Sequence, residues 1–162
     1  MLRALQFSDL VNEDLIIDNL ESSTKEDALE RMAKILVQHG FCKPSFVQAI
    51  LDREAAHPSG LPMPGRKIAI PHTDATHVIR SAMLFARLTK PVEFLAMGSP
   101  QERLQVTMIS MFALKEKKLI GDLLETLITV YQHEEVLEAL YKAADRSAMF
   151  QILKGNVERY GK

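Results

Sequence analysis

The chain has 162 residues, of which 47% are hydrophobic and 25% charged, and its formal net charge is -1. This length is enough for one domain with a full core, so we expect residues 1–162 to form a single domain. The balanced charge gives no general attraction to nucleic acid or membrane surfaces, and the absence of tryptophan argues against an aromatic platform for stacking bases.

We find no targeting signal and no pair of cysteines in the sequence. The first ten residues contain no long apolar core and no small-residue cleavage site, so we expect no signal peptide. No window approaches the roughly 20 apolar residues that a spanning helix needs. A single cysteine, Cys42, excludes an internal disulfide and leaves no cysteine cluster for zinc. These features predict a cytoplasmic protein without direct membrane insertion.

The first third of the chain predicts one strand and two helices. Residues 15–17 form a short β-like run. Thr24, with Asp27 three residues later, resembles a capping box, and the helix that follows should stop at Gly40.

A second helix should begin near Pro44, which suits a first helical position. Arg53 and Glu54 are expected off its apolar stripe, near the helix end. Residues 57–65 contain three prolines and two glycines and should form a loop.

The middle of the chain predicts strands. A strand at residues 67–70 is followed by one at 80–88, by a turn at Lys90-Pro91, and by a segment at 92–94 that pairs back. Residues 104–114 form an uncharged, nearly continuous apolar run, which indicates a central strand covered on both faces.

The last third predicts a charged loop at residues 115–118 and three helices, with a frayed tail over residues 155–162. The helices are expected around 120–131, 136–141 and 149–153. Strands mixed with helices indicate an α/β (α+β) sandwich, a mixed β-sheet with helices on both faces.

The segment Lys67-Ile-Ala-Ile-Pro-His72 organises the chain. Pro71 cannot donate to a sheet ladder, so the strand should end there and place His72 on a loop held by a rigid scaffold. Imidazole titrates near neutrality and offers a nucleophilic nitrogen at cellular pH. We therefore predict that His72 carries a phosphoryl group.

A phosphoryl group needs positive charge or backbone N–H groups around its oxygens. Arg53 is the candidate for a bidentate clamp. The Ser59-Gly60 turn is the candidate for a nest of backbone amides.

These residues together resemble a known family. Arg53-Glu54, then Pro-Ser-Gly60, then Ile68-Ala-Ile-Pro-His72, then Ser81-Ala-Met are similar in order and spacing to the enzyme IIA component of the fructose–mannitol class of the bacterial phosphotransferase system (EIIA type 2). The loop with a second histidine, His77, looks most like the galactitol-type branch.

The resemblance implies a phosphotransferase component that acts as a phosphocarrier in sugar uptake, with a galactitol-like sugar as one option. The histidine at the His72 position would accept a phosphoryl group from the phosphocarrier protein HPr. It would pass the group to a cysteine of a IIB component, which works with the membrane component IIC. The Arg53 position would stabilise the group, and no metal or organic cofactor would be needed.

The sequence departs from the family pattern in the residue that would assist His72. Many mannitol- and fructose-type members have a second active-site histidine at the start of the helix after the central strand, and residues 115–124 contain none. His77 or a backbone carbonyl could orient His72 instead, and Glu54 is a further supporting candidate. His57, in the proline-rich loop, is expected to lie outside the site.

Three alternatives stay open. A nitrogen-related regulatory member of the same family would be phosphorylated at the same histidine and act by binding proteins. A metal-dependent hydrolase would use His72, Asp74 and His77 as zinc ligands, although three residues of one flexible loop lack a supporting shell. A scaffolding protein would leave the shared motif unexplained.

Overall fold

A computed structural model describes residues 6–161. Its sheet has four strands in the order β1-β3-β4-β2, with β3 and β4 antiparallel and the outer strands each parallel to their neighbours. The strands are β1 (Ile16–Leu20), β2 (Lys67–Ala69), β3 (Ala82–Ala96) and β4 (Ser99–Ala113). The helices are α1 (Lys25–Gln38), α2 (Ser45–Ala56), α3 (Ile120–Tyr131), α4 (Glu134–Lys142) and α5 (Arg146–Tyr160).

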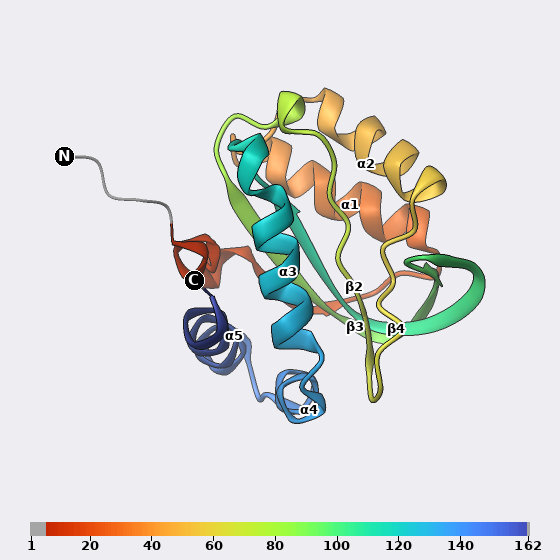
Figure 1. Cartoon of the computed structure of the whole chain (residues 1–162), viewed down its shortest axis with the longest axis vertical. Helices are drawn as coiled ribbons and strands as arrows, with labels where there is room; N and C mark the ends of the chain where they lie inside the picture. The colour runs from red at the N-terminus through yellow and green to blue at the C-terminus, as the bar shows by residue number, and fades with distance from the viewer. Residues whose placement is uncertain (1–5, 162) are drawn as a thin grey trace.

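The sheet separates two hydrophobic cores. Helices α1 and α2 cover one face, and α3, α4 and α5 cover the other (Figure 1). Side chains of β4 alternate between the two cores, so that Met111 packs on the first and Phe112 on the second. The predicted mixed sheet with helices on both faces is confirmed, and residues 104–113 of the predicted central strand lie in β4, between β3 and β2. None of the helices within residues 6–161 has the length and hydropathy to span a membrane.

The cap of α1 forms as its sequence predicts. The Thr24 side chain accepts a hydrogen bond from the Asp27 amide at 3.1 Å, and Gly40 follows the helix with a φ of 79°. A positive φ is costly for residues with a Cβ, which explains the glycine at this stop.

Helix α2 differs from expectation at one residue that matters for the site. Glu54 was expected off the apolar stripe, but it is only 4% exposed. It lies four residues after the fully buried Ile50, so both side chains point to the same face of the helix. Arg53, one position earlier, is exposed. Consecutive residues of a helix point about 100° apart, so Glu54 faces the core while Arg53 faces solvent.

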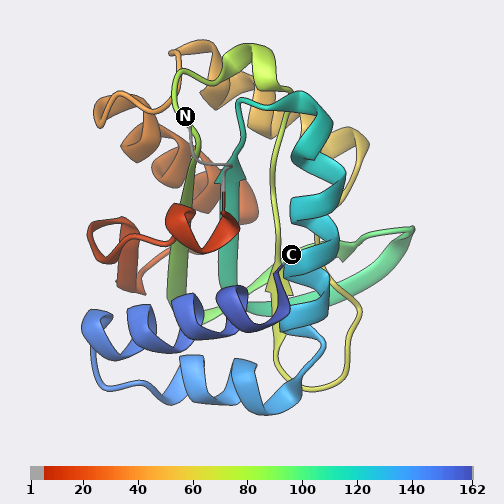
Figure 2. The same ribbon diagram turned by 60° about the vertical axis from the view of Figure 1, so that its left-hand side comes forward.

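The predicted turn at Lys90-Pro91 is wrong. Strand β3 runs through it, and the register against β4 shifts between Arg87 and Val92. Proline is accommodated at such irregularities because its missing N–H is not needed in the ladder. Val92 consequently pairs with Val106 of β4. The chain reverses only at the Met97-Gly98 turn, and the β3–β4 hairpin projects beyond the helices (Figure 2).

The predicted frayed tail over 155–162 is also wrong for the described part of the chain. Helix α5 continues to Tyr160, and Val157 is fully buried against the second core. One apolar residue at helical spacing after Leu153 is enough to hold the last turns in place. Residues 1–5 and residue 162 lie outside the described residues. Residues 1–5 are half of the ten-residue segment in which no signal peptide is expected.

Candidate functional site

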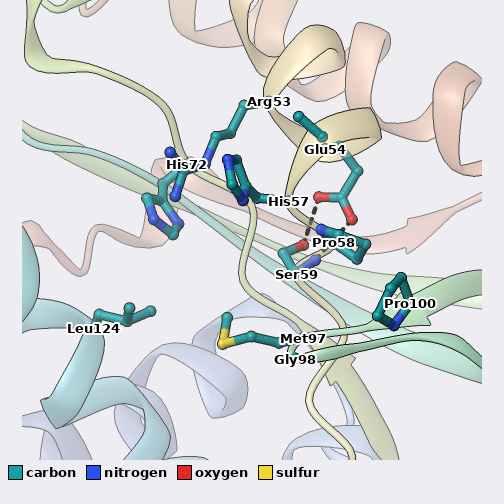
Figure 3. Close-up of a pocket in the computed structure, with 11 residues that line it drawn as sticks. Arg53, Glu54, His57, Pro58, Ser59, His72, Met97, Gly98, Pro100 and Leu124 are labelled. Carbon is teal, nitrogen blue, oxygen red and sulfur yellow. Dashed lines mark hydrogen bonds between the residues drawn. The ribbon is translucent and has the colours of Figure 1, made fainter.

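A cavity of about 380 Å³ opens at the carboxyl end of α2. It is bounded by the end of α2, the loop that follows, His72 from the loop after β2, the β3–β4 turn and one side chain of α3 (Figure 3). Its lining residues are Arg53, Glu54, Ala56, His57, Pro58, Ser59, His72, Met97, Gly98, Pro100 and Leu124. Four of the predicted site residues, Arg53, Glu54, Ser59 and His72, therefore meet at one place.

His72 is oriented by the backbone just before it. Its Nδ1 lies 3.0 Å from the carbonyl oxygen of Ile70. A carbonyl only accepts hydrogen bonds, so Nδ1 carries the proton and Nε2 keeps its lone pair. Of the two supports that the sequence leaves open, the backbone carbonyl is the one present.

The ring of His72 is also held by an aromatic neighbour. It stacks on Phe112 with ring centroids 4.6 Å apart and an interplanar angle of 11°. Phe112 is buried near the end of β4, and its amide donates to the carbonyl of Pro71 at 3.2 Å. The role of Phe112 was not predicted, because no sequence signal near His72 indicates which residue of a strand 40 positions away will face the ring.

The pKa of His72 is lowered from its ordinary value of 6.5. Burial is the main cause, because it disfavours the charged ring, and the positive charge of Arg53 acts in the same direction. The hydrogen bond to Ile70 partly opposes both. His72 is thus neutral at pH 7, which is the form that can attack an electrophile.

Ser59 and Glu54 form a buried pair at the floor of the loop. The Ser59 amide donates to Oε2 of Glu54 at 2.9 Å, and the Ser59 hydroxyl donates to Oε1 at 2.6 Å. Burial raises the pKa of Glu54, while both bonds from Ser59 lower it. Glu54 therefore fastens the loop to the end of α2, beside His72.

The next residues fasten the same loop to the sheet. Gly60 donates its amide to the carbonyl of Leu95 at 3.1 Å and forms a bridge with Ala69 of β2. Ile70 donates to the carbonyl of Ser59 at 3.0 Å. Since the amides of Ser59 and Gly60 both have protein acceptors, this geometry does not support the predicted nest. Gly60 is also not among the residues that line the cavity.

Arg53 is the cationic side chain of the cavity lining. It is exposed, and within residues 6–161 it has no hydrogen bond or ion pair. The guanidinium therefore offers its donors and its charge to an anion in the cavity.

The positions of two histidines relative to the cavity differ from the sequence prediction. His77, the predicted support, has its Nδ1 2.8 Å from the hydroxyl of Ser45 and does not line the cavity. His57, expected outside the site, does line it. The spacing offered a signal for this, because His57 follows Arg53 by four residues and so shares its side of the helix end.

The metal-centre alternative has no cluster to support it. Among the described residues, no three His, Cys, Asp or Glu side chains are grouped so that they could hold a metal ion. The set of His72, Asp74 and His77 is thus not brought together as ligands.

Comparison with known proteins identifies a family. The model of the family described as "Phosphoenolpyruvate-dependent sugar phosphotransferase system, EIIA 2" matches residues 9–156. A fructose-specific EIIABC component of Bacillus subtilis is 26% identical over 92% of this chain, and a galactitol-specific EIIA component of Escherichia coli is 27% identical over 65% of it. The match covers 79% of the galactitol protein. Identities this similar do not distinguish the galactitol type from the fructose type.

The chain spans only 23% and 20% of the length of the first two curated relatives, the fructose protein and a mannitol-specific EIICBA component of E. coli. Two solved structures share its fold. The complex of mannitol enzyme IIA with phosphorylated mannitol enzyme IIB from E. coli matches with a TM-score of 0.72 at 23% identity, over 89% of this chain and 96% of that one. The nitrogen regulatory protein IIA-Ntr from Neisseria meningitidis matches with a TM-score of 0.69 at 21% identity, over 90% and 97%.

Proposed function

The chain belongs to the EIIA 2 family of the phosphoenolpyruvate-dependent sugar phosphotransferase system, and on that premise we propose that it carries a phosphoryl group on Nε2 of His72. One observation supports this assignment most. The bond from Nδ1 to the Ile70 carbonyl leaves Nε2 as the nitrogen with a lone pair, in a cavity that also holds the unpaired cation of Arg53.

The reaction requires no proton transfer at His72. We take the donor to be a phosphohistidine of the phosphocarrier protein HPr. The Nε2 lone pair of His72 forms a bond to phosphorus while the bond from phosphorus to the donor's imidazole nitrogen breaks, and the donor imidazole keeps that electron pair. The proton on Nδ1 stays in its hydrogen bond, and the Ile70 carbonyl stabilises the positive charge that develops on the ring. Stacking on Phe112 restricts the ring to the attacking orientation.

Arg53 stabilises the charge of the transferring group. The phosphoryl oxygens carry negative charge throughout the transfer, and catalysis of such reactions depends on positioning and on nearby positive charge. Ser59 contributes indirectly, since its bonds to Glu54 hold the wall of the cavity.

The donor and the acceptor follow from the family. We propose that the phosphocarrier protein HPr supplies the group and that a cysteine of a IIB component receives it, in the cytoplasm, during sugar uptake through a IIC component. The solved complex of a structurally similar IIA with phosphorylated IIB supports the acceptor. No resident cofactor takes part in this sequence of transfers.

A regulatory role is the second candidate. The structural match to the nitrogen regulatory protein IIA-Ntr supports it. Both roles use a phosphorylated His72, so the difference lies in the partner. Transfer of the phosphoryl group to a IIB cysteine supports transport, whereas protein binding that changes with phosphorylation and proceeds without transfer supports regulation.

Intact-mass analysis tests the shared chemistry. The protein is incubated with phosphoenolpyruvate, enzyme I and HPr, and the wild type is compared with His72→Ala. We expect one added phosphoryl group, which acid removes, on the wild type only. Full labelling of the variant would contradict the assignment of His72, and no labelling of the wild type by active donor proteins would contradict the phosphocarrier function.

A further inference from the structure

We propose that His57 is a second imidazole of the phosphoryl site and donates a hydrogen bond to an oxygen of the group on Nε2 of His72. This inference rests on the proposed function and assigns a role to a residue outside the shared motif. His57 lines the same cavity as His72 and Arg53, as Figure 3 shows.

The position of His57 is set by the end of helix α2. It is the C-cap residue of that helix, and its amide donates to the carbonyl of Arg53 at 2.7 Å. A residue four positions after Arg53 is placed one helical turn further along the same side. The helix thus presents a guanidinium and an imidazole to the same cavity.

His57 differs from the other histidines in having no partner. The rings of His39, His72 and His77 are each within hydrogen-bond distance of a protein oxygen, and the ring of His133 stacks on Tyr160. Within residues 6–161, the ring of His57 has no hydrogen bond, ion pair or ring contact. It is exposed to solvent, so its N–H can be offered to a ligand without breaking any internal contact.

The free donors of the cavity suit an anion at this position. Arg53 contributes a cation, and the carboxylate of Glu54 is already bound by both donors of Ser59. The other walls contribute no charge, because the β3–β4 turn presents Met97, Gly98 and Pro100 and α3 presents Leu124. Imidazole has a ring N–H in both its neutral and its protonated form, so it remains a donor across the physiological pH range.

His57→Ala tests the proposal, and His39→Ala is its matched control. Each histidine is an exposed C-cap residue, His57 on α2 and His39 on α1, but His39 lies outside the cavity and bonds to the carbonyl of Ile35. We expect His57→Ala to take the group from phospho-HPr roughly 10-fold more slowly, because one hydrogen bond to the transferring oxygens is lost. His39→Ala should match the wild type. His57→Gln, whose amide also donates, should recover part of the rate.

Phosphorus NMR of the phosphorylated proteins supplies a readout that a merely structural role would not move. Loss of a donor to the phosphoryl oxygens makes the dianion less favourable, so the pKa of the phosphoryl group should rise in His57→Ala and stay unchanged in His39→Ala.

The outcomes separate this proposal from the one it rests on. A wild-type protein that takes no phosphoryl group overturns the proposed function. A wild type that is labelled at His72, with His57→Ala equal to it in both rate and phosphoryl pKa, overturns only the role of His57. Peptide mapping that finds the group on His57 itself also overturns the donor role.

Discussion

The imidazole of His72 lies flat against the ring of Phe112, with centroids 4.6 Å apart and planes inclined by 11°. The two residues come from different parts of the chain, one from the loop after β2 and the other from the end of β4. Their backbones are joined as well, since the Phe112 amide donates to the Pro71 carbonyl. The imidazole of His72 is therefore held on one face by the Phe112 ring and at Nδ1 by the Ile70 carbonyl.

Phe112→Leu should separate ring positioning from stability. Leucine fills most of the buried volume, so the free energy of unfolding should fall by roughly 1–2 kcal/mol, less than the cost of removing the whole side chain. The flat surface under the imidazole is lost, so phosphorylation of His72 by phospho-HPr should slow. The rate is measured at a temperature where the variant is fully folded, so that the lower stability cannot explain the change. Urea unfolding and labelling kinetics test this. An unchanged labelling rate would show that the stacking does not position the ring.

The pH dependence of His72 follows from its lowered pKa. Its ring should titrate below 6.5 in NMR spectra of the folded protein, mainly because burial disfavours the cation. The unfolded chain binds a proton at this residue near 6.5 and the folded protein does so only at lower pH, so this group's contribution to stability is lost as the pH falls through that range. In Arg53→Ala the midpoint should rise, because a nearby positive charge is removed. A midpoint above 6.5 in the wild type would contradict the prediction.

Arg53→Ala should slow transfer substantially and leave the fold intact. Removing one charge-stabilising donor costs on the order of 3 kcal/mol in other enzymes, which corresponds to about a hundredfold in rate. The side chain is exposed, so the free energy of unfolding should change by less than about 0.5 kcal/mol. Arg53→Lys should give an intermediate rate, since it keeps the charge and loses the bidentate geometry. Equal rates for all three proteins would remove Arg53 from the site.

Glu54→Ala should loosen the wall of the cavity. The substitution removes both acceptors of Ser59 and leaves its buried amide unpaired, at a cost of about 1–3 kcal/mol in the free energy of unfolding. Hydrogen exchange of the Ser59 amide should accelerate. Asp52→Ala, on the exposed side of the same helix, is the control and should leave the exchange of Ser59 unchanged. Slow exchange of Ser59 in the Glu54 variant would mean that the loop is held without the carboxylate.

Gly60→Ala should push the same loop off the sheet. A Cβ at this position would stand 2.7 Å from the carbonyl oxygen of Leu95 and 3.0 Å from Cδ1 of Leu104. Such crowding costs about 1–3 kcal/mol. Gly155→Ala is the matched control, because its Cβ would meet no atom within 4 Å and alanine favours the middle of α5. Thermal unfolding should show a lower midpoint for the first variant and an equal or higher one for the second.

Local sequence was sufficient for much of this protein. The cap at Thr24, the stop at Gly40 and the end of β2 before Pro71 follow from propensities and missing donors within a few residues. Local sequence also placed His72 on a loop after a strand, and the resemblance to the family in the order of motifs connected it with Arg53. Where the local prediction was wrong, as at Pro91 and at the end of α5, pairing with β4 and burial of Val157 decided the outcome.

Tertiary structure decided which distant residues surround His72. The sequence by itself determined the mixed sheet, the two covering layers and the candidate histidine, because hydrophobic periodicity and turn residues act over short distances. The aromatic ring under His72, the burial of Glu54, and the entry of His57 and the removal of His77 from the site depend on how distant segments pack. Helical spacing indicates which side chains share a face, but the packing of each helix end or strand end against the sheet decides what that face meets.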